Sequence, residues 1–300
     1  AGGLPHHAVA ASAFFLSGNS GMKVFISVDM EGISGVVHSS QAPPKRRDYE
    51  WARTMMAGDT NAAIEGALEA GAKEIVVADA HDGMRNLRLD ELHPAASLVS
   101  GSGRPLSMIH GIDASFDALF MVGYHAMTGV RDGIMNHAYI SQALQRIKLN
   151  GREIGEIGIF AGIAGGVGVP VALVTGDDAC CREARDWLPQ AQTASVKTGI
   201  NRFAAQCLSQ QKAHKLIRRS AKNALQGDFL SLIRPLSPPQ NTRFEIEFTG
   251  SQCADSAARV PGVARLDDRS IAIENDDYLN AFASLRLCLE LASSAFDADY

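Results

Sequence analysis

Short apolar runs alternate with longer segments of helical pattern through the first two thirds of the chain. Residues 24–26, 74–79 and 117–123 are mainly apolar, which predicts buried β-strands. Residues 49–70 follow the first strand, with Ala, Met and Ile on one stripe and Gly71 as a stop. Strands that alternate with helices in this order form a parallel sheet with right-handed crossovers. The pattern therefore predicts an α/β fold with a mostly parallel sheet flanked by helices.

Further elements of the same kind extend this pattern towards the middle of the chain. Strands are predicted at 96–100, 169–175 and 193–197, a helical turn at 107–112, and helices at 157–167, 179–187 and 209–225.

The remainder of the chain follows a different pattern, and the proline-rich residues 235–239 mark its clearest boundary. Asn150-Gly151 lies between two short runs and predicts a β-hairpin. The other elements expected here are strands at 145–149, 152–154, 243–249 and 270–274, and a closing helix at 276–293 with Asp276 as its cap. We therefore expect a second α/β or α+β C-terminal part. This expectation divides the chain into an N-terminal domain, 22–145, and a C-terminal domain, 146–300.

The first 21 residues are expected to lie outside this fold. Residues 8–16 are small and apolar, but no Lys or Arg precedes them, so they make a poor signal peptide. A flexible stretch rich in Ser and Gly leads directly to Met22, which we interpret as the natural start. We expect residues 1–21 to be an expression-derived extension or a disordered tail, in which His6-His7 has no metal-binding role.

Acidic and histidine side chains follow the predicted strands where each strand ends. Asp29 and Glu31 come directly after the first strand, and because residues i and i+2 point to the same face, their carboxylates project side by side. His81 follows the strand at 74–79, and His125 follows the strand at 117–123. Ligand sites of open α/β sheets collect at the carboxyl ends of strands, so we expect these side chains to share one edge.

This set of side chains predicts a metal site. Neighbouring carboxylates repel each other unless positive charge lies between them. The ligand candidates are Asp29, Glu31, His81, His125 and Glu156, the last at the start of a predicted helix. Five oxygen and nitrogen ligands exceed the needs of one tetrahedral catalytic zinc, which favours two metals with a bridging carboxylate and a shared water. Taken singly, each residue is more typical of ordinary structure, such as a loop histidine or a first-turn glutamate.

The composition narrows the function classes. The 300 residues are 46% hydrophobic and 20% charged, which is ordinary for a globular protein. The net charge of −5 argues against a nucleic-acid partner, and no apolar run is long enough to span a membrane. The five cysteines are odd in number and form no Cys-x-x-Cys pair. This usage fits neither a disulfide framework nor a thiolate zinc site, and favours a cytoplasmic location.

An ordered set of short motifs runs from Met22 to the closing helix. The first is Ser-Val-Asp-Met-Glu-Gly-Ile-Ser-Gly at 27–35. The others are Asp-Ala-His at 79–81, Gly-Tyr-His-Ala at 123–126, Met-Asn-His at 135–137, Gly-Glu-Ile-Gly at 155–158, Val-Thr-Gly-Asp-Asp at 174–178 and Val-Lys at 196–197. Together they resemble the DppA family of dizinc D-aminopeptidases, whose signature is Ser-x-Asp-x-Glu-Gly. The order of the whole set is far more specific than the signature alone.

The resemblance implies two zinc ions per subunit and a role for each candidate. Asp29 would bridge the two ions. Glu31 and His81 would complete one site, and His125 and Glu156 would complete the other. His137 matches a further active-site histidine of the family, and is the candidate catalytic residue. The stretch before it, 128–132, is slightly longer in this chain than in the family.

The resemblance also implies an activity and an assembly. The family releases N-terminal residues from short peptides, with D-alanyl peptides as the known preference of its founding member, and forms a homo-oligomeric decamer of two five-membered rings. No motif in this sequence separates D from L substrates. The residues alone leave two other functions open, because two-metal sites also serve esterases and phosphoesterases, and because a non-catalytic metal- or peptide-binding protein could carry the same ligands.

Overall fold

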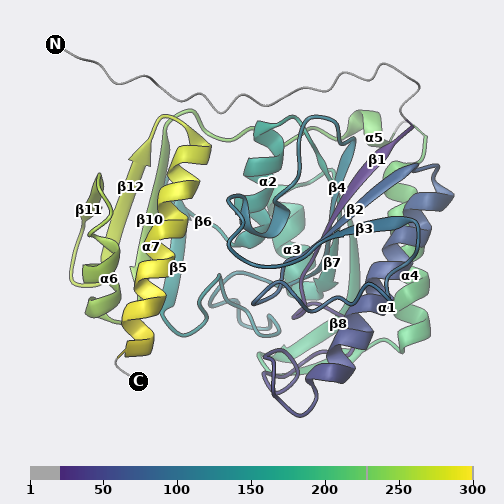
Figure 1. The fold of residues 1–300 in the computed structure, drawn as a ribbon, viewed down its shortest axis with the longest axis horizontal. Helices are drawn as coiled ribbons and strands as arrows, with labels where there is room; N and C mark the ends of the chain where they lie inside the picture. Colours follow the sequence, from purple (N-terminus) through teal and green to yellow (C-terminus); the bar gives the residue numbers. More distant parts are fainter. Residues whose placement is uncertain (1–20, 228, 299–300) are drawn as a thin grey trace.

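The structure is a computed structural model that describes residues 21–227 and 229–298, whose strands form two sheets (Figure 1). The larger sheet contains β1 (Lys23–Val28), β2 (Glu74–Asp79), β3 (Ala96–Val99), β4 (Ala118–Tyr124), β7 (Val171–Asp177), β8 (Gln192–Asn201) and β9 (Ala204–Cys207). The smaller sheet contains β5 (Leu144–Leu149), β6 (Arg152–Glu153), β10 (Thr242–Phe248), β11 (Val263–Arg265) and β12 (Ser270–Asn275). The extension expected at residues 1–21 lies, apart from Gly21, outside the described residues.

The direction of the strands separates the two sheets. The larger has the order β3-β2-β1-β4-β7-β8-β9, and its neighbours run parallel except for the antiparallel pair β8 and β9. The smaller has the order β11-β12-β10-β5-β6 and is antiparallel throughout. The predicted α/β class, with a mostly parallel sheet and a second C-terminal part, is confirmed.

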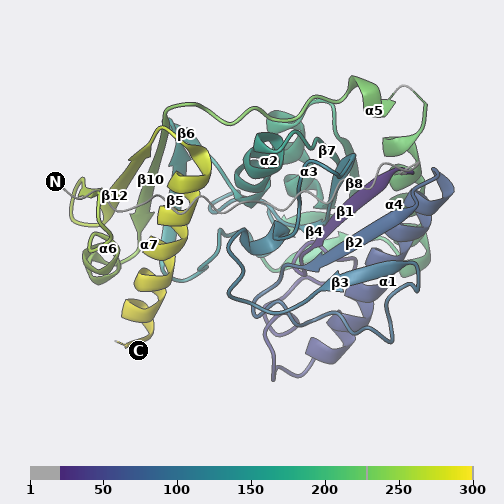
Figure 2. The ribbon, with the colours of Figure 1, turned by 45° about the horizontal axis from the view of Figure 1, so that its top comes forward.

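Helices cover both faces of the larger sheet (Figures 1 and 2). On one face, α1 (Tyr49–Glu69) and α4 (Gln210–Leu225) pack against each other and share an apolar core with Ile26 and Val28. On the other, α2 (Glu156–Gly166) and α3 (Asp178–Trp187) share a core with Phe25. This explains why the strands are apolar on both faces, as parallel strands buried between helices must be.

The smaller sheet is joined to that second core through its helices. α6 (Ser251–Ala257) and α7 (Tyr278–Ala298) pack together and against β10 and β12. Phe282 of α7 meets Phe160 of α2 edge to face, with ring centroids 5.9 Å apart. Figure 2 shows α7 between the smaller sheet and the helices of the larger one. The last helix of the chain therefore connects the core of the smaller sheet with that of the larger one.

The carboxyl ends of β2, β1 and β4 meet at one edge, because these three strands are neighbours and run parallel. Val28 lies in register with Asp79 on one side and Val122 on the other. The pairing continues one residue beyond the strand, since the Asp29 N–H donates to the Val122 carbonyl at 2.8 Å. The residues that follow the three strands consequently emerge side by side, as expected.

Two glycines allow the β1 and β4 ends to approach closely. A Cβ on Gly32 would overlap the carbonyl oxygen of Tyr124, and one on Gly123 would lie 2.5 Å from the Ile33 side chain. Gly123 also has a φ of +71°, which favours glycine. Both glycines belong to the sequence motifs, so the motifs carry a backbone requirement as well as ligands.

Most predicted elements are present, and the exceptions are short. The Asn150-Gly151 hairpin is confirmed, with φ values of +48° and +83° and antiparallel pairing of its strands. The turn at 107–112 is a 3₁₀-helix, η1 (Ser107–Ile109). The sequence analysis did not predict β9, β11, α6 or α5 (Phe229–Leu232), none of which exceeds seven residues.

The predicted helix cap at Asp276 is wrong by one residue. α7 begins at Tyr278, and the Asp277 carboxylate accepts the Asn280 N–H at 2.8 Å. This is the geometry of a helix cap, because the side chain of the residue before the helix satisfies an amide of the first turn. Asp276 and Asp277 are equally suited to cap a helix, so the sequence pattern alone does not identify which of the two does so.

The division into domains at 145 and 146 stays a prediction. β7, β8 and β9 follow residue 146 yet pair in the larger sheet, whereas β5, which begins at Leu144, belongs to the smaller sheet. The proline-rich stretch 235–239 lies in the connection between α5 and β10, where the chain returns to the smaller sheet.

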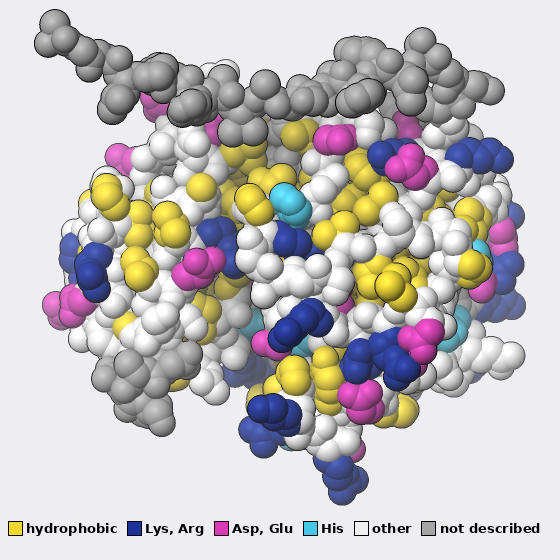
Figure 3. Space-filling model, in the orientation of Figure 1, with side chains coloured by type: hydrophobic (Ala, Val, Ile, Leu, Met, Phe, Trp, Pro, Cys, Tyr) yellow, Lys and Arg dark blue, Asp and Glu magenta, His cyan; other side chains and the backbone are white. Residues whose placement is uncertain are grey.

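No helix among the described residues is long and apolar enough to cross a membrane. On the face shown in Figure 3, Lys and Arg are interspersed with Asp and Glu.

Candidate metal centre

The six predicted site residues lie together at the carboxyl edge of the larger sheet. Five of them are almost fully buried: Asp29 (3% exposed), Glu31 (6%), His81 (7%), His125 (3%) and Glu156 (5%). The sixth, His137, is partly exposed and lies in the loop between β4 and β5. Glu156 reaches the others from the first turn of α2, so that both halves of the chain contribute.

Asp29 occupies the middle of this cluster. Its Oδ1 lies 3.2 Å from His81 Nδ1, and its Oδ2 lies 3.4 Å from His125 Nε2. Each carboxylate oxygen therefore faces a different histidine. Glu31 Oε2 lies 3.0 Å from the His81 nitrogen, and Glu156 Oε2 lies 3.5 Å from the His125 nitrogen. The arrangement has two halves that share Asp29.

Backbone carbonyls fix which nitrogen of each histidine is free. His81 Nε2–H donates to the Ala42 carbonyl at 3.1 Å, and His125 Nδ1–H donates to the Ala126 carbonyl at 3.0 Å. His137 Nδ1–H donates to the Met135 carbonyl at 2.8 Å. A metal-ligating histidine commonly holds its second ring nitrogen in this way. The opposite nitrogen of each ring is left available to a ligand.

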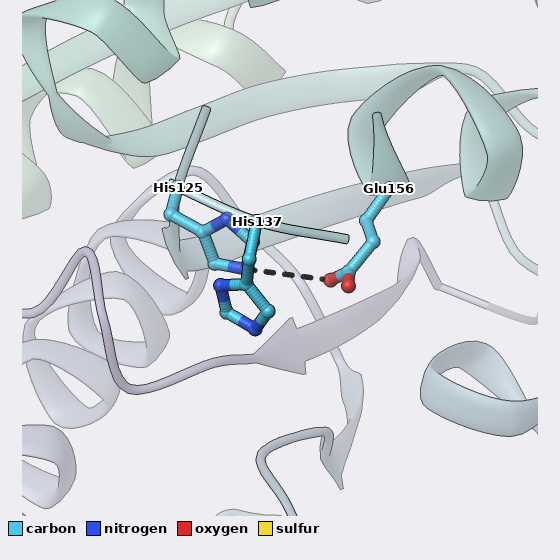
Figure 4. Close-up of side chains that lie close together, drawn as sticks. All are labelled: His125, His137 and Glu156. Carbon is cyan, nitrogen blue, oxygen red and sulfur yellow. Dashed lines mark ion pairs between the residues drawn. The ribbon is translucent and has the colours of Figure 1, made fainter. Parts of the chain in front are cut away.

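His137 stacks on His125 (Figure 4), with ring centroids 4.1 Å apart and planes within 12°. Its loop is strained, because Met135 and Tyr139 both have positive φ values, +46° and +53°. The Tyr139 N–H donates to Glu156 Oε1 at 2.6 Å and ties the loop to α2. Histidine and carboxylate atoms of His125, His137 and Glu156 lie within 4.8 Å of one another, as do those of Asp29, Glu31 and His125.

Charge strongly couples the members of the cluster. Burial alone would raise the pKa of Asp29, but close contact with the His125 and His81 rings and their positive charge hold that pKa well below its usual value. Burial alone would lower the pKa of each of these histidines, but Glu31, Asp29 and Glu156 raise it well above the usual value. Protons on the histidines thus neutralise the carboxylates, and a metal ion would supply the same positive charge.

The donor set fits metal ions. Glu31 Oε2 and His125 Nε2 are buried without a hydrogen-bond partner in the described part of the chain. The nearest imidazole nitrogen to Glu31 Oε2 lies 3.0 Å away, and the nearest carboxylate oxygens to His125 Nε2 lie 3.4 and 3.5 Å away. Such orphaned atoms are costly unless something pairs with them. Two ligand atoms that each bind zinc at about 2 Å lie a little over 3 Å apart in a tetrahedral site. Oxygen and imidazole ligands together suit zinc.

A cavity of about 390 Å³ opens onto the cluster. Its walls include Asp29, Glu31, His81, His137 and Glu156. Helix α7 also lines it, through residues that include Arg286 and Glu290 near the end of the chain. The cavity therefore has room for a small substrate directly beside the candidate metal ligands.

Buried Lys197 supports the loop that carries Glu31, a role that the sequence analysis did not assign. From β8, its Nζ donates to the carbonyls of Glu31 at 2.6 Å, Ile33 at 2.8 Å, and Val36. Burial lowers the pKa of Lys197 to about 8. Buried lysines are rare, so the residue type alone predicts an exposed position. The sequence feature that singled out Lys197 was its position in the Val-Lys motif at 196–197. The ammonium thus ties three carbonyls of this loop, within six residues of chain, to β8.

Replacement of Lys197 by Met should weaken metal binding at the Glu31 half of the cluster by about 10- to 100-fold, as loss of an outer support typically does. The carbonyls would lose their shared donor and the loop would no longer hold Glu31 in place. Zinc affinity, measured by competition with a chromogenic chelator, tests this. Lys212→Met, at an exposed position of α4, is the control. Unchanged zinc affinity in a folded Lys197→Met protein would refute the supporting role.

Comparisons with known proteins agree over nearly the whole chain. The D-aminopeptidase family, peptidase family M55, matches residues 22–287. A D-aminopeptidase of Bacillus subtilis (strain 168) is 36% identical over 272 residues, which cover 90% of this chain and 98% of that protein.

A solved structure is similar at the level of the fold. It is the Zn-dependent D-aminopeptidase DppA from Bacillus subtilis, described as a self-compartmentalizing protease. The TM-score is 0.87 at 36% sequence identity, and the match covers 91% of this chain and 98% of that chain.

Proposed function

The chain belongs to the D-aminopeptidase family, and we propose that it is a zinc-dependent enzyme that releases N-terminal D-residues, such as D-alanine, from short peptides. The observation that carries this function is the buried cluster around Asp29, in which carboxylate oxygens and imidazole nitrogens lie 3.0–3.5 Å apart beside a cavity. Membership of the family supplies the reaction class, and the cluster supplies the chemistry that such a reaction needs.

We further propose that the cluster holds two zinc ions. Asp29 would bridge them, with Glu31 and His81 completing one site and His125 and Glu156 completing the other. The support is that the two Asp29 oxygens face different histidines, each accompanied by its own glutamate. Bound zinc ions would polarise the scissile carbonyl and lower the pKa of water towards neutrality.

His137 is proposed to move a proton during the reaction. Its Nδ1–H is held by the Met135 carbonyl, and the residue lines the cavity. Burial and the charge of His125 lower the pKa of His137, so the ring is mainly neutral at pH 7. A neutral imidazole can accept a proton and pass it to the leaving amine nitrogen.

The proposed assembly is a homo-oligomer, specifically a decamer of two five-membered rings in which residues 146–300 supply contacts between subunits. The support is the similarity to a self-compartmentalizing protease. A light-scattering mass that differs from ten chains would contradict it. We also propose a cytoplasmic location, because five cysteines, odd in number and without a Cys-x-x-Cys pair, fit a reducing compartment.

A substrate panel tests the proposed reaction. We expect the zinc-loaded protein to release D-alanine from D-alanyl-D-alanine faster than L-alanine from L-alanyl-L-alanine, and to leave p-nitrophenyl phosphate intact. Free amino acid is measured by chromatography and nitrophenol by absorbance. Turnover of the phosphate ester alone would identify a phosphoesterase. Bound zinc with no turnover of any peptide would indicate a binding protein.

A further inference from the structure

The cavity beside the metal cluster also has a cationic wall. Arg104 and Arg286 both line it, as do Asp29, Glu31 and Glu156. Arg286 lies 3.1 Å from Glu290, a residue of the same helix, so its charge is compensated. Arg104 forms no ion pair among the side chains that the structure describes, although the negative charge of Asp79 acts on it. The cavity therefore contains one arginine without a carboxylate in direct contact.

Backbone contacts hold the Arg104 side chain in a fixed place. Its Nη1 donates to the Val99 carbonyl at 3.3 Å, and its Nη2 donates to the Asp79 carbonyl. Its Nε is buried and has no hydrogen-bond partner within the described chain. An unpaired, partly buried cation is unfavourable unless an anion joins it. A guanidinium held rigidly with a free donor is suited to bind a carboxylate.

Two hydroxyl groups of the same cavity share this unsatisfied state. Ser107 Oγ and Tyr139 OH are both buried, and neither has a partner among the residues described. The backbone of each residue is held at a positive φ, +49° for Ser107 and +53° for Tyr139. Strain of this kind gathers at ligand sites, where the surrounding structure enforces it. Arg104, Ser107 and Tyr139 thus add three unused donors to the cavity wall.

Arg104 is tied to the segment of chain that leads into the metal cluster. Arg104 binds the carbonyl of Asp79, which is two residues before the candidate ligand His81. Two residues of chain span at most about 7 Å. In a dipeptide, the terminal carboxylate lies one residue, about 4 Å, beyond the scissile carbonyl. Because Arg104 and the cluster line the same cavity, a short peptide with its scissile bond at the cluster would have its carboxylate on the side of the cavity where Arg104 lies.

We propose that Arg104, with Ser107 and Tyr139, forms a subsite that binds the C-terminal carboxylate of the peptide substrate. This inference rests on the proposed aminopeptidase function and adds a rule for substrate length. The subsite favours dipeptides, which end one residue after the scissile bond and carry a free carboxylate. Peptide amides and longer chains, which cannot place a carboxylate there, bind less well.

The comparison of an acid with its amide tests the subsite. The substrates are D-alanyl-D-alanine and D-alanyl-D-alaninamide, and the readout is kcat/KM for D-alanine release by the zinc-loaded full chain. The wild-type protein should prefer the acid. Arg104→Met should lower kcat/KM for the acid by about 10- to 100-fold, the usual effect of losing a hydrogen bond to a charged group, and leave the amide unchanged. The loss should fall mainly on KM.

Matched variants keep the test decisive. Arg286→Met removes a cation of the same cavity that is already paired, and should keep the preference for the acid. Tyr139→Phe removes only the hydroxyl, retains the backbone contact to Glu156, and should lower kcat/KM for the acid by several-fold if Arg104→Met does not fold. Equal loss on both substrates, or no loss on either, would overturn the subsite. Failure to hydrolyse even the amide would instead refute the aminopeptidase function.

Discussion

Asp29→Ala is expected to lose both metal ions and to reduce peptide hydrolysis to background. Each Asp29 oxygen faces a different histidine, so its removal takes a ligand from both halves of the cluster at once. The remaining carboxylates, Glu31 and Glu156, each have an ion-pair contact with one histidine, His81 and His125 respectively. Enzymes commonly accelerate their reactions by about 10⁶-fold or more, and loss of the ions would remove that gain. Metal content by atomic emission and D-alanine release are the measurements.

Glu31→Ala is the matched control for this prediction. Glu31 is buried to a similar degree but has its one ion-pair contact with His81, so its loss should weaken mainly one of the two metal sites. We expect this variant to retain close to one ion per chain under conditions that strip Asp29→Ala completely. Equal metal retention in the two variants would contradict the bridging role of Asp29.

His137→Ala is expected to lower kcat by about 10²- to 10⁴-fold while both metal ions remain bound. This range is the usual contribution of general acid–base catalysis by one side chain. The His137 side chain stacks on His125 and, among the described residues, hydrogen-bonds to the Met135 carbonyl alone, so its removal leaves the hydrogen bonds and ion pairs of the five proposed ligands in place. Imidazole added to the solution should restore part of the rate, because the vacated space adjoins the cavity.

The metal content of His137→Ala separates two roles. His137 lies close enough to His125 and Glu156 to be a ligand itself. Loss of one ion from the variant would assign His137 to the metal site and contradict the proton-transfer role. An unchanged kcat would exclude both roles.

The elements that place the site could be predicted because their signals are local. An apolar run followed by a polar residue identifies a buried strand and its end, and parallel order then brings Asp29, His81 and His125 to one edge. Glu156 followed from the start of a helix rich in small residues. These predictions did not require knowledge of which residues contact each side chain or of how the loops run.

The supporting residues could not be predicted because their roles depend on contacts between distant parts of the chain. Lys197 donates to carbonyls more than 160 residues earlier, and a lysine is by default a surface residue. Arg104 acts from a loop whose sequence has no helical or strand pattern. Arg286 reaches the cavity from the final helix, which packs on the smaller sheet. Short elements such as β11 and α6 carry too few residues for a period to be visible.

A zinc titration of the metal-stripped full chain, followed by D-alanine release from D-alanyl-D-alanine, tests the central claim most directly. The claim is that paired zinc ions at the Asp29 cluster support D-aminopeptidase activity. We expect no release from the stripped protein and a rise in release that reaches its plateau at two zinc ions per chain. Release from the stripped protein, or zinc binding at two per chain without any release, would contradict the claim.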